Sequence, residues 1–293
     1  MVPGLPARAM PDLEYHSGFH DCSETLASGA RARPPLKVVH MMTHEGSWSE
    51  PYTIRVYETD ITSRLRMDAL FDYFQEMAWR HVVALSLDYE TLKTLGYVWY
   101  LSRARVRVHR QPVWGESGTI ETWHATTDGL MFVRDFRLTD TAGRTMIEAA
   151  TGWLLIDTTA FRPHAADVLP VPLPPNNRGR ALDEPMKKIV PPRSLASVYE
   201  RRVYQSEIDV NQHVNNARYL AWVFDCYEEG FLRTHLLRAL QVNYVGETAL
   251  GDTVALSRGE DPASPLTHYV EGVSAGKGSR VVQALLTWEP VAA

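Results

Sequence analysis

Three polar side chains alternate along the segment DVNQHVNN, directly before an apolar stretch with helical spacing. They are Asp209, Asn211 and His213. In an extended chain alternate side chains point to one face, so the three would converge near the start of that helix. Free N–H groups at a helix start can stabilise an oxyanion, and amide and imidazole groups can hold a carbonyl or move a proton. The pattern therefore suits acyl transfer or hydrolysis of a carbonyl compound.

The same residue types also favour turns and helix caps, and an isolated DxNxH is most often only that. A second copy of the segment favours a chemical role over a turn or a cap. Segments 55–73 and 202–220 align without a gap, and Arg55-Val56-Tyr57 then falls on Arg202-Val203-Tyr204. In this register Asp209, Asn211 and His213 face Thr62, Arg64 and Arg66. The contrast between a polar and a basic copy favours chemistry in the second copy.

A further candidate acid is Glu247, which ends a predicted strand before a Gly-Asp turn, although a strand-end glutamate usually faces solvent. The chain contains no GxSxG nucleophile elbow, no HExxH and no phosphate-binding glycine loop at a strand–helix junction. Cys22 and Cys226 lie far apart without metal-ligand spacing. Neither a disulfide framework nor a metal site is expected.

The two copies share an order of elements: a strand, a long helix and an antiparallel meander. In the first copy we expect a helix over 67–85 and strands over 52–57, 98–110, 118–129, 130–140 and 144–157. In the second copy we expect a helix over 214–231 and strands over 199–209, 239–247, 252–260, 266–273 and 279–289. The sequence thus predicts an α+β protein of two tandem hotdog domains, each a long helix wrapped by an antiparallel sheet. Pairing of their edge strands would make one long sheet.

These elements divide the chain into four parts. We expect a poorly ordered leader over 1–48, an N-terminal hotdog over 49–162 and a C-terminal, catalytic hotdog over 198–293. Eight prolines fall between Pro163 and Pro192, which predicts a semi-rigid linker over 163–197.

The composition limits the function classes. With 293 residues and a net charge of -5, the chain is not expected to bind nucleic acid, which needs a basic surface. The leader has no apolar signal region, and no stretch approaches the roughly 20 apolar residues of a membrane span. A cytoplasmic protein is therefore expected, and a homodimer is compatible with the sequence.

Long segments of the chain resemble the acyl-acyl-carrier-protein (acyl-ACP) thioesterases of bacteria and plants. The most specific is DVNQHVNNARYLAW at 209–222. The others are YxIRxYExD at 52–60, FQExAWRH at 74–81, LSRxRVRVxRxPxWGE at 101–116, ETW at 121–123 and RDFxLxDxxG at 134–143. The resemblance covers about residues 50–291 and implies two tandem hotdogs that hydrolyse the thioester of a fatty acyl chain on carrier-protein phosphopantetheine.

Carried over by position, the resemblance makes Asp209, Asn211, His213 and Glu247 the catalytic residues. Backbone N–H groups of Val214 and Asn215 would hold the oxyanion. The first hotdog would shape the acyl pocket, and no metal or cofactor is implied. Some plant members have Cys directly after the catalytic acid, where this chain has Thr248. This departure favours water activated by Glu247, with assistance from His213, over a cysteine nucleophile.

The expected partner is an acyl carrier protein with a phosphopantetheine-linked acyl chain. Because that protein is acidic, a local basic patch would dock it, and the candidate residues are Arg64, Arg66, Arg103, Arg105 and Arg107. A solvated strand face explains the last three equally well. Two other functions stay open: an acyl-coenzyme A thioesterase with the same fold, and a non-catalytic acyl-binding protein. For the pocket, Met67, Phe71, Phe74 and Met77 are candidates, and core packing alone accounts for them equally well.

Overall fold

The computed structural model describes residues 41–42, 46–261 and 264–291. Most of the expected leader, and Cys22 with it, lies outside these residues. A two-residue strand, β1 (Met41–Met42), pairs with the strand that opens the first repeat.

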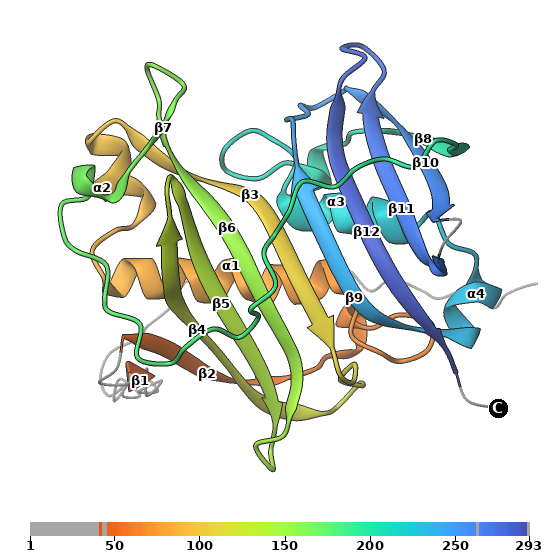
Figure 1. The fold of residues 1–293 in the computed structure, drawn as a ribbon, viewed down its shortest axis with the longest axis horizontal. Helices are drawn as coiled ribbons and strands as arrows, with labels where there is room; N and C mark the ends of the chain where they lie inside the picture. Colours follow the sequence, from red (N-terminus) through yellow and green to blue (C-terminus); the bar gives the residue numbers. More distant parts are fainter. Residues whose placement is uncertain (1–40, 43–45, 262–263, 292–293) are drawn as a thin grey trace, which may run out of the picture. The chain divides into compact units, whose positions relative to one another are not determined.

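The first repeat contains one long helix and five long strands (Figure 1). Helix α1 spans Met67–Ala84, as predicted, and the short helix α2 spans Tyr89–Thr94. The strands are β2 (Ser47–Thr53), β3 (Tyr97–Val108), β4 (Ser117–Asp128), β5 (Met131–Asp140) and β6 (Thr145–Asp157). A 3-10 turn, η1 (Val56–Glu58), lies between β2 and α1.

The second repeat has the same order. Helix α3 spans Asn216–Phe224, and α4 spans Glu229–Thr234. The strands are β8 (Ala196–Arg202), β9 (His235–Tyr244), β10 (Thr253–Asp261), β11 (Ser264–Ser274) and β12 (Arg280–Pro290), and the 3-10 turn is η3 (Gln205–Glu207). The connection between the repeats holds β7 (Pro163–His164), which pairs with β6, and η2 (Ala166–Val168).

All the long strands belong to one antiparallel sheet in the order β2-β4-β5-β6-β3-β9-β12-β11-β10-β8. Each repeat contributes the same internal order, and the strands β3 and β9 join the repeats edge to edge, from Arg103 opposite Asn243 to Arg107 opposite Ala239. The expectation that the repeats share one long sheet is confirmed.

Both long helices lie on one face of this sheet, behind it in the view of Figure 1. Alternate residues of the strands meet them, because successive strand side chains point to opposite faces. In the first repeat the ring of Phe74 on α1 stacks on Phe136 of β5, with centroids 4.3 Å apart. The buried core runs without a break from α1 to Leu220 and Val223 of α3. The α+β hotdog architecture that the sequence predicts is therefore present in both repeats.

The register that we drew between the repeats is wrong by two residues. The structure equates Glu58 with Glu207, because each accepts the backbone N–H at the start of its 3-10 turn. It likewise equates Asp60 with Asp209, since each carboxylate accepts an N–H two residues later, at 2.7 and 2.8 Å. Asn211 and His213 then correspond to Thr62 and Arg64, so Arg66 is not the partner of His213. The shared E-x-D spacing carried the correct register, and the Arg-Val-Tyr match was a coincidence.

Two predicted elements of the second repeat have different bounds in the structure. The strand expected over 199–209 ends at Arg202, where η3 and a tight loop follow. The helix expected over 214–231 stops at Phe224. Its backbone then turns through i→i+3 hydrogen bonds at Cys226 and Tyr227, and the Tyr227 ring packs on Trp288 with centroids 4.9 Å apart. Burial of this aromatic ring in the core competes with continuation of the helix.

The proline-rich linker crosses the opposite face of the sheet, in front of it in Figure 1. Asp135 of β5 accepts hydrogen bonds there from Arg180 Nε at 3.0 Å and from the Ala181 N–H at 2.7 Å. Ala181 and Leu182 cover a small second core that includes Trp123. The linker is therefore a structural cover for the outer face of the sheet.

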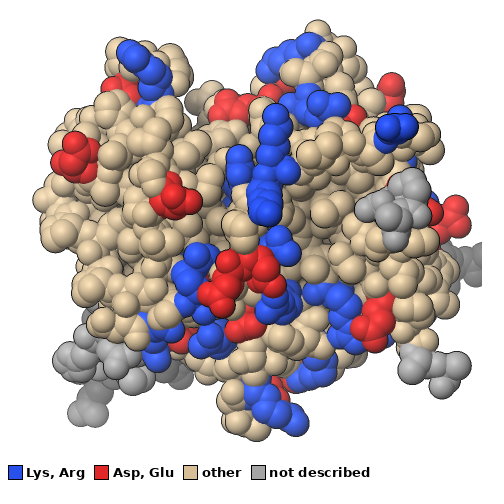
Figure 2. All heavy atoms as spheres, viewed as in Figure 1, with Lys and Arg blue, Asp and Glu red and all other residues tan. Residues whose placement is uncertain are grey.

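Three arginines of β3 on this face contact the linker or the neighbouring strand. Arg103 donates to the Met186 carbonyl at 2.7 Å, Arg107 pairs with Glu184, and Arg105 donates to Gln241 of β9 at 3.3 Å. They contact the linker and the neighbouring strand, and their role in carrier-protein docking stays a prediction. Figure 2 shows blue and red side chains mixed along the centre of this face.

The linker anchor can be tested with Asp135→Ala. Asp135 is fully buried, so the substitution leaves Arg180 and the Ala181 N–H without their acceptor. We expect a loss of about 2–3 kcal/mol in unfolding free energy, together with faster proteolysis within 176–189. Asp183→Ala, at an exposed position of the same linker, should change stability by less than about 0.5 kcal/mol. Equal losses in the two variants would contradict the anchor.

Candidate active site

Asp209, Asn211 and His213 lie on a closed loop and not on an extended strand. The Asp209 N–H donates to the His213 carbonyl at 3.0 Å, and the Gln212 N–H donates to the Asp209 carbonyl at 3.0 Å. Gln212 has a φ of 64°, in the left-handed region. The Asp209 carboxylate accepts the Asn211 N–H at 2.8 Å. Asp209 therefore shapes the loop, as Asp60 does in the first repeat, while Asn211 and His213 stay exposed.

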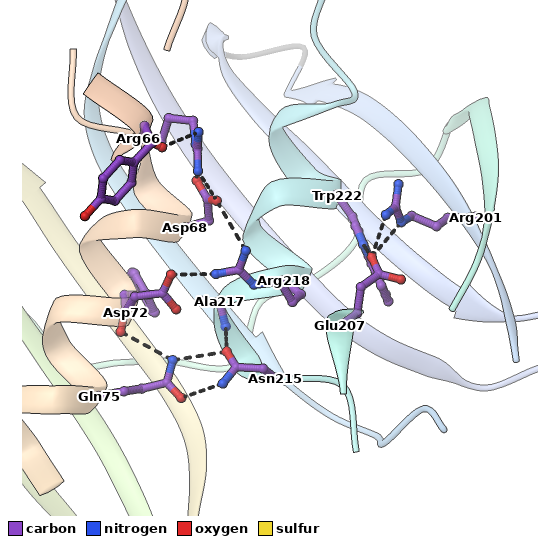
Figure 3. Close-up of polar contacts among 12 residues, drawn as sticks. Arg66, Asp68, Asp72, Gln75, Arg201, Glu207, Asn215, Ala217, Arg218 and Trp222 are labelled. Atoms are coloured by element: carbon purple, nitrogen blue, oxygen red, sulfur yellow. Dashed lines mark hydrogen bonds and ion pairs between the residues drawn. The ribbon is translucent and has the colours of Figure 1, made fainter. Parts of the chain in front are cut away.

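A buried carboxylate ties this loop to helix α3 (Figure 3). Glu207 is 5% exposed and accepts from Arg201 Nε and from Trp222 Nε1, each at 2.8 Å. Its backbone carbonyl accepts the Asn215 N–H at 2.9 Å. The first repeat uses Glu58 in the same way, with Tyr73 of α1 donating at 2.9 Å. A carboxylate with several donors fixes the loop against its helix.

His213 and Glu247 face each other at the end of this loop. The distance from His213 Nε2 to Glu247 Oε2 is 3.4 Å, and each side chain is about half exposed, at 47% and 48%. Glu247 follows the end of β9, so the two residues come from segments that are distant in sequence. Tyr100 of β3 lines the same cavity, and burial, followed by the charge of Glu247, raises the pKa of its hydroxyl.

The backbone N–H groups of Val214 and Asn215, which the sequence suggested as oxyanion donors, already have acceptors within the protein. The Val214 N–H donates to the Thr248 carbonyl at 3.1 Å, and the Asn215 N–H donates to the Glu207 carbonyl. Both donors are therefore occupied. The Asn215 side chain caps α3 by accepting the Ala217 N–H at 2.9 Å. Within the described part of the chain, the first N–H of α3, that of Asn216, has no acceptor.

Neither alternative nucleophile has a suitable environment. Thr248 is 1% exposed, and its hydroxyl lies 2.7 Å from the Tyr219 hydroxyl. Cys226 is buried behind α3, and burial raises the pKa of its thiol to about 12. A thiol with so high a pKa is almost entirely protonated at neutral pH and reacts poorly.

The first repeat also holds the start of α3 (Figure 3). Gln75 of α1 and Asn215 exchange two amide hydrogen bonds, each 3.2 Å long. One turn away, Arg218 of α3 donates to Asp72 at 2.5 Å and lies 3.8 Å from Asp68. The start of α3 is thus fixed by polar contacts to α1 that the sequence did not indicate.

A cavity of about 610 Å³ connects the two repeats. Asn211, His213 and Glu247 line its exposed end, together with Asn216. Residues of the first repeat line much of the rest, among them the buried Leu92 and Phe132 and the partly buried Trp153. Helix α1 contributes Gln75, Ala78, Trp79 and Val82, whereas Met67, Phe71, Phe74 and Met77 pack in the core. Core packing therefore accounts for those four residues.

A charged side chain that the sequence analysis missed lies at the buried end. Arg134 of β5 lines the cavity at 7% exposure, and burial lowers the pKa of its guanidinium to about 10. Its Nη1 lies 2.8 Å from His81 Nδ1 and 3.3 Å from the Thr122 hydroxyl. Burial, and then Arg134, lower the pKa of His81 to about 3, so this imidazole is neutral. The alternation of Phe132, Arg134 and Phe136 on one strand face was the sequence signal for an inward arginine.

Two family signatures match this chain. The acyl-ACP thioesterase N-terminal domain matches residues 45–168, and the acyl-ACP thioesterase C-terminal domain matches residues 193–290. The chain belongs to the acyl-ACP thioesterase family. This thioesterase is 26% identical over 275 residues to oleoyl-acyl carrier protein thioesterase 2, chloroplastic, of Arabidopsis thaliana, covering 88% of this chain and 75% of that protein. It is 22% identical over 280 residues to dodecanoyl-[acyl-carrier-protein] hydrolase, chloroplastic, of Umbellularia californica, covering 88% and 71%.

Solved structures show the same fold. The 12:0-ACP thioesterase from Umbellularia californica superposes with a TM-score of 0.73 at 19% identity, over 86% of this thioesterase and all of that chain (100%). An acyl-ACP thioesterase from Bacteroides thetaiotaomicron gives a TM-score of 0.72 at 22% identity, covering 83% and 98%. None of the helices in the described part of this thioesterase combines the length and apolar character needed to cross a bilayer.

The contact between the repeats can be tested by a double-mutant cycle on Gln75 and Asn215. Asn215→Ala removes a helix cap and should cost about 1 kcal/mol in unfolding free energy. Because Gln75 and Asn215 bond each other, we expect a coupling energy of about 0.5–1 kcal/mol when Gln75→Ala is added. Glu76→Ala, on the exposed side of α1, should be additive with Asn215→Ala. Additivity within about 0.3 kcal/mol for the Gln75 pair would contradict the contact.

The buried His81 predicts a pH dependence of stability. Its folded pKa is lowered, so the unfolded chain binds the proton more readily, and stability is lost as the pH falls from about 6.5 toward 3. This group alone should remove about 2 kcal/mol between pH 7 and pH 5. His81→Gln keeps a neutral acceptor for Arg134 and does not titrate. Denaturant unfolding of both proteins should therefore show a shallower acid loss in the variant, and parallel pH curves would contradict the assignment.

Proposed function

We propose that this thioesterase hydrolyses fatty acyl-ACP by direct attack of water at the His213–Glu247 pair. The observation that carries this proposal is one continuous cavity. An acid–base pair 3.4 Å apart lines its exposed end, and largely apolar side chains of the other repeat line its buried end. A thioester at the exposed end would place its acyl chain in the buried part, where chain burial is favourable.

In the proposed reaction Glu247 accepts a proton from water as the water oxygen bonds to the thioester carbonyl carbon. Collapse of the tetrahedral intermediate breaks the carbon–sulfur bond. The proton passes from Glu247 to His213 across their 3.4 Å separation and then to the leaving sulfur. The products are a free fatty acid and the carrier-protein thiol. The roles of both residues are proposals that rest on this separation and on their common cavity.

The oxyanion needs donors other than those expected from the sequence. We assign this role to the Asn216 N–H and to the Asn211 side-chain amide. Both residues line the cavity, and within the described residues neither group has a hydrogen-bond acceptor. The Asn216 N–H also lies at the positive end of the α3 dipole. Asp209 contributes by holding the loop in its closed shape.

Acyl-coenzyme A carries the same phosphopantetheine arm, so the cavity alone does not separate the two thioesters. The curated relatives are named for acyl carrier protein substrates, which supports that partner. Two further points stay predictions: cytoplasmic localisation, and docking of the carrier protein through Arg64, Arg66, Arg103, Arg105 and Arg107. A comparison of kcat/KM on matched carrier-protein and coenzyme A thioesters tests the choice of carrier.

Substitutions at the pair should remove turnover without unfolding the protein. His213→Ala, Asn211→Ala and Glu247→Ala should each lower kcat by about 10²–10⁴-fold, because the exposed side chains contribute to chemistry more than to stability. Thr62→Ala, at the position equivalent to Asn211, should retain kcat within about twofold, and the Tm of all four should stay close to wild type. Stopped-flow hydrolysis and thermal unfolding provide the two measurements.

The same samples decide what attacks the thioester. Mass spectrometry of quenched turnover should show no covalent acyl-enzyme, and Thr248→Val should keep most of the activity. An acyl adduct on Thr248 or Cys226 would overturn the water-attack mechanism. Loss of activity in Thr62→Ala equal to that in Asn211→Ala would overturn the assignment of chemistry to the second repeat.

A further inference from the structure

The proline-rich linker also reaches the acyl cavity, because it passes α2 before it crosses the outer face of the sheet (Figure 1). Leu173 lines the cavity of about 610 Å³ and is the one residue of the linker, described over all of 163–197, that does so. Val168, Leu169 and Val171 pack against the same apolar cluster without lining the cavity. The linker therefore contributes to the wall of the cavity at a single side chain.

Leu173 lies at the end of the cavity that is distant from the reacting groups. Helix α1 runs along the cavity, and its residue Gln75 lies at the catalytic end, beside the start of α3. Val82 lines the cavity two turns further on, about 10 Å along the helix at 1.5 Å per residue. Val82 packs in one apolar cluster with Leu173, Leu92 and Phe132, and all four line the cavity. Leu173 thus belongs to the deep end.

The backbone around Leu173 has little freedom to move. Pro172 and Pro174 flank this residue. Each proline fixes its own φ and disfavours the helical conformation in the residue before it. Shortly afterwards the Asn176 side chain donates to the Ala125 carbonyl at 2.7 Å and so ties the linker to β4. The Leu173 side chain is therefore presented to the cavity by a stiff segment, and not by a loop that could yield to a longer ligand.

We propose that Leu173 closes the deep end of the acyl pocket and sets the longest acyl chain that this thioesterase accepts. The methyl end of an unbranched fatty acyl chain would contact the Leu173 side chain, and burial of that contact is favourable. A longer chain would have to displace the leucine or move its thioester away from the catalytic groups. The proposal rests on the proposed function, since it assigns the far end of the same substrate.

Hydrolysis of a series of saturated acyl-ACP thioesters, each two carbons longer than the last, tests the proposal. Leu173→Ala should raise kcat/KM for the thioester two carbons beyond the wild-type optimum by about 10–100-fold relative to that optimum, because one methylene in an apolar pocket changes discrimination by about 10-fold or more. Leu173→Trp fills the deep end and should move the optimum to a shorter chain. An optimum that stays in place in both variants would overturn the proposal.

Val171→Ala is the matched control. Val171 lies on the same linker and packs against the same cluster, but it does not line the cavity. We expect a lower Tm, as in Leu173→Ala, and a ratio of kcat/KM between the two chain lengths that stays within about twofold of wild type. An equal change of the ratio in Val171→Ala would refute a specific role of Leu173. If Leu173→Ala does not fold, Leu173→Val should change the ratio in the same direction by a smaller factor.

A binding measurement separates this proposal from the proposed function. With the Glu247→Ala protein, isothermal titration of free saturated fatty acids should show an affinity that rises with length up to a limit. Adding Leu173→Ala should move the limit to a longer acid, and adding Val171→Ala should leave it unchanged. The same limit in all three proteins would contradict a wall at Leu173. By contrast, wild-type protein that hydrolyses no acyl-ACP of any length would overturn the proposed function, and the titrations would still test the wall.

Discussion

The antiparallel pairing of β3 with β9 is the constraint on which the rest of the structure depends. Backbone hydrogen bonds between these two edge strands join the repeats into one sheet and fix their register. Because both long helices lie on one face of that sheet, the pairing also brings α1 against α3. The cavity then extends from the loop before α3 into the first repeat. On the other face, the arginines of β3 and Gln241 of β9 hold the linker.

The loop before each helix shows what the duplication kept and what it changed. Glu58 and Glu207 both tie their loops to a helix, and Asp60 and Asp209 both close them. Residues with these buried or backbone-directed bonds maintain the shape. The remaining positions of the loop carry different side chains in the two repeats, the partly buried Thr62 and Arg64 against the exposed Asn211 and His213. One scaffold therefore presents two different sets of side chains.

The cavity has opposite charge character at its two ends. Glu247 lies at the exposed end, where water can reach it, and Arg134 lies at the buried end, where its charge is desolvated. The rest of the lining is largely apolar, with Leu92, Phe132 and Trp153. A charge in solvent costs little, but a charge among such side chains is costly.

Much of the architecture followed from the sequence. Helical spacing predicted α1 almost to the residue, and alternation predicted the strands of both meanders, because burial of one face imposes these periods. The types and spacing of Asp209, Asn211 and His213 also drew attention to a loop that lines the cavity. Residue-level identity, however, gave the wrong register between the repeats, since the match of Arg-Val-Tyr outweighed the shorter E-x-D signal.

Only the tertiary structure decided which groups meet. In the folded chain His213 faces Glu247, and Arg134 lines the cavity. The N–H groups of Val214 and Asn215 already have hydrogen-bond acceptors. The tertiary structure also brought the linker against Arg103 of β3. Most of these results depend on contacts between segments that are far apart in the chain. Local periodicity determines which face of an element is buried, but the partner on that face is chosen by the packing of the whole sheet.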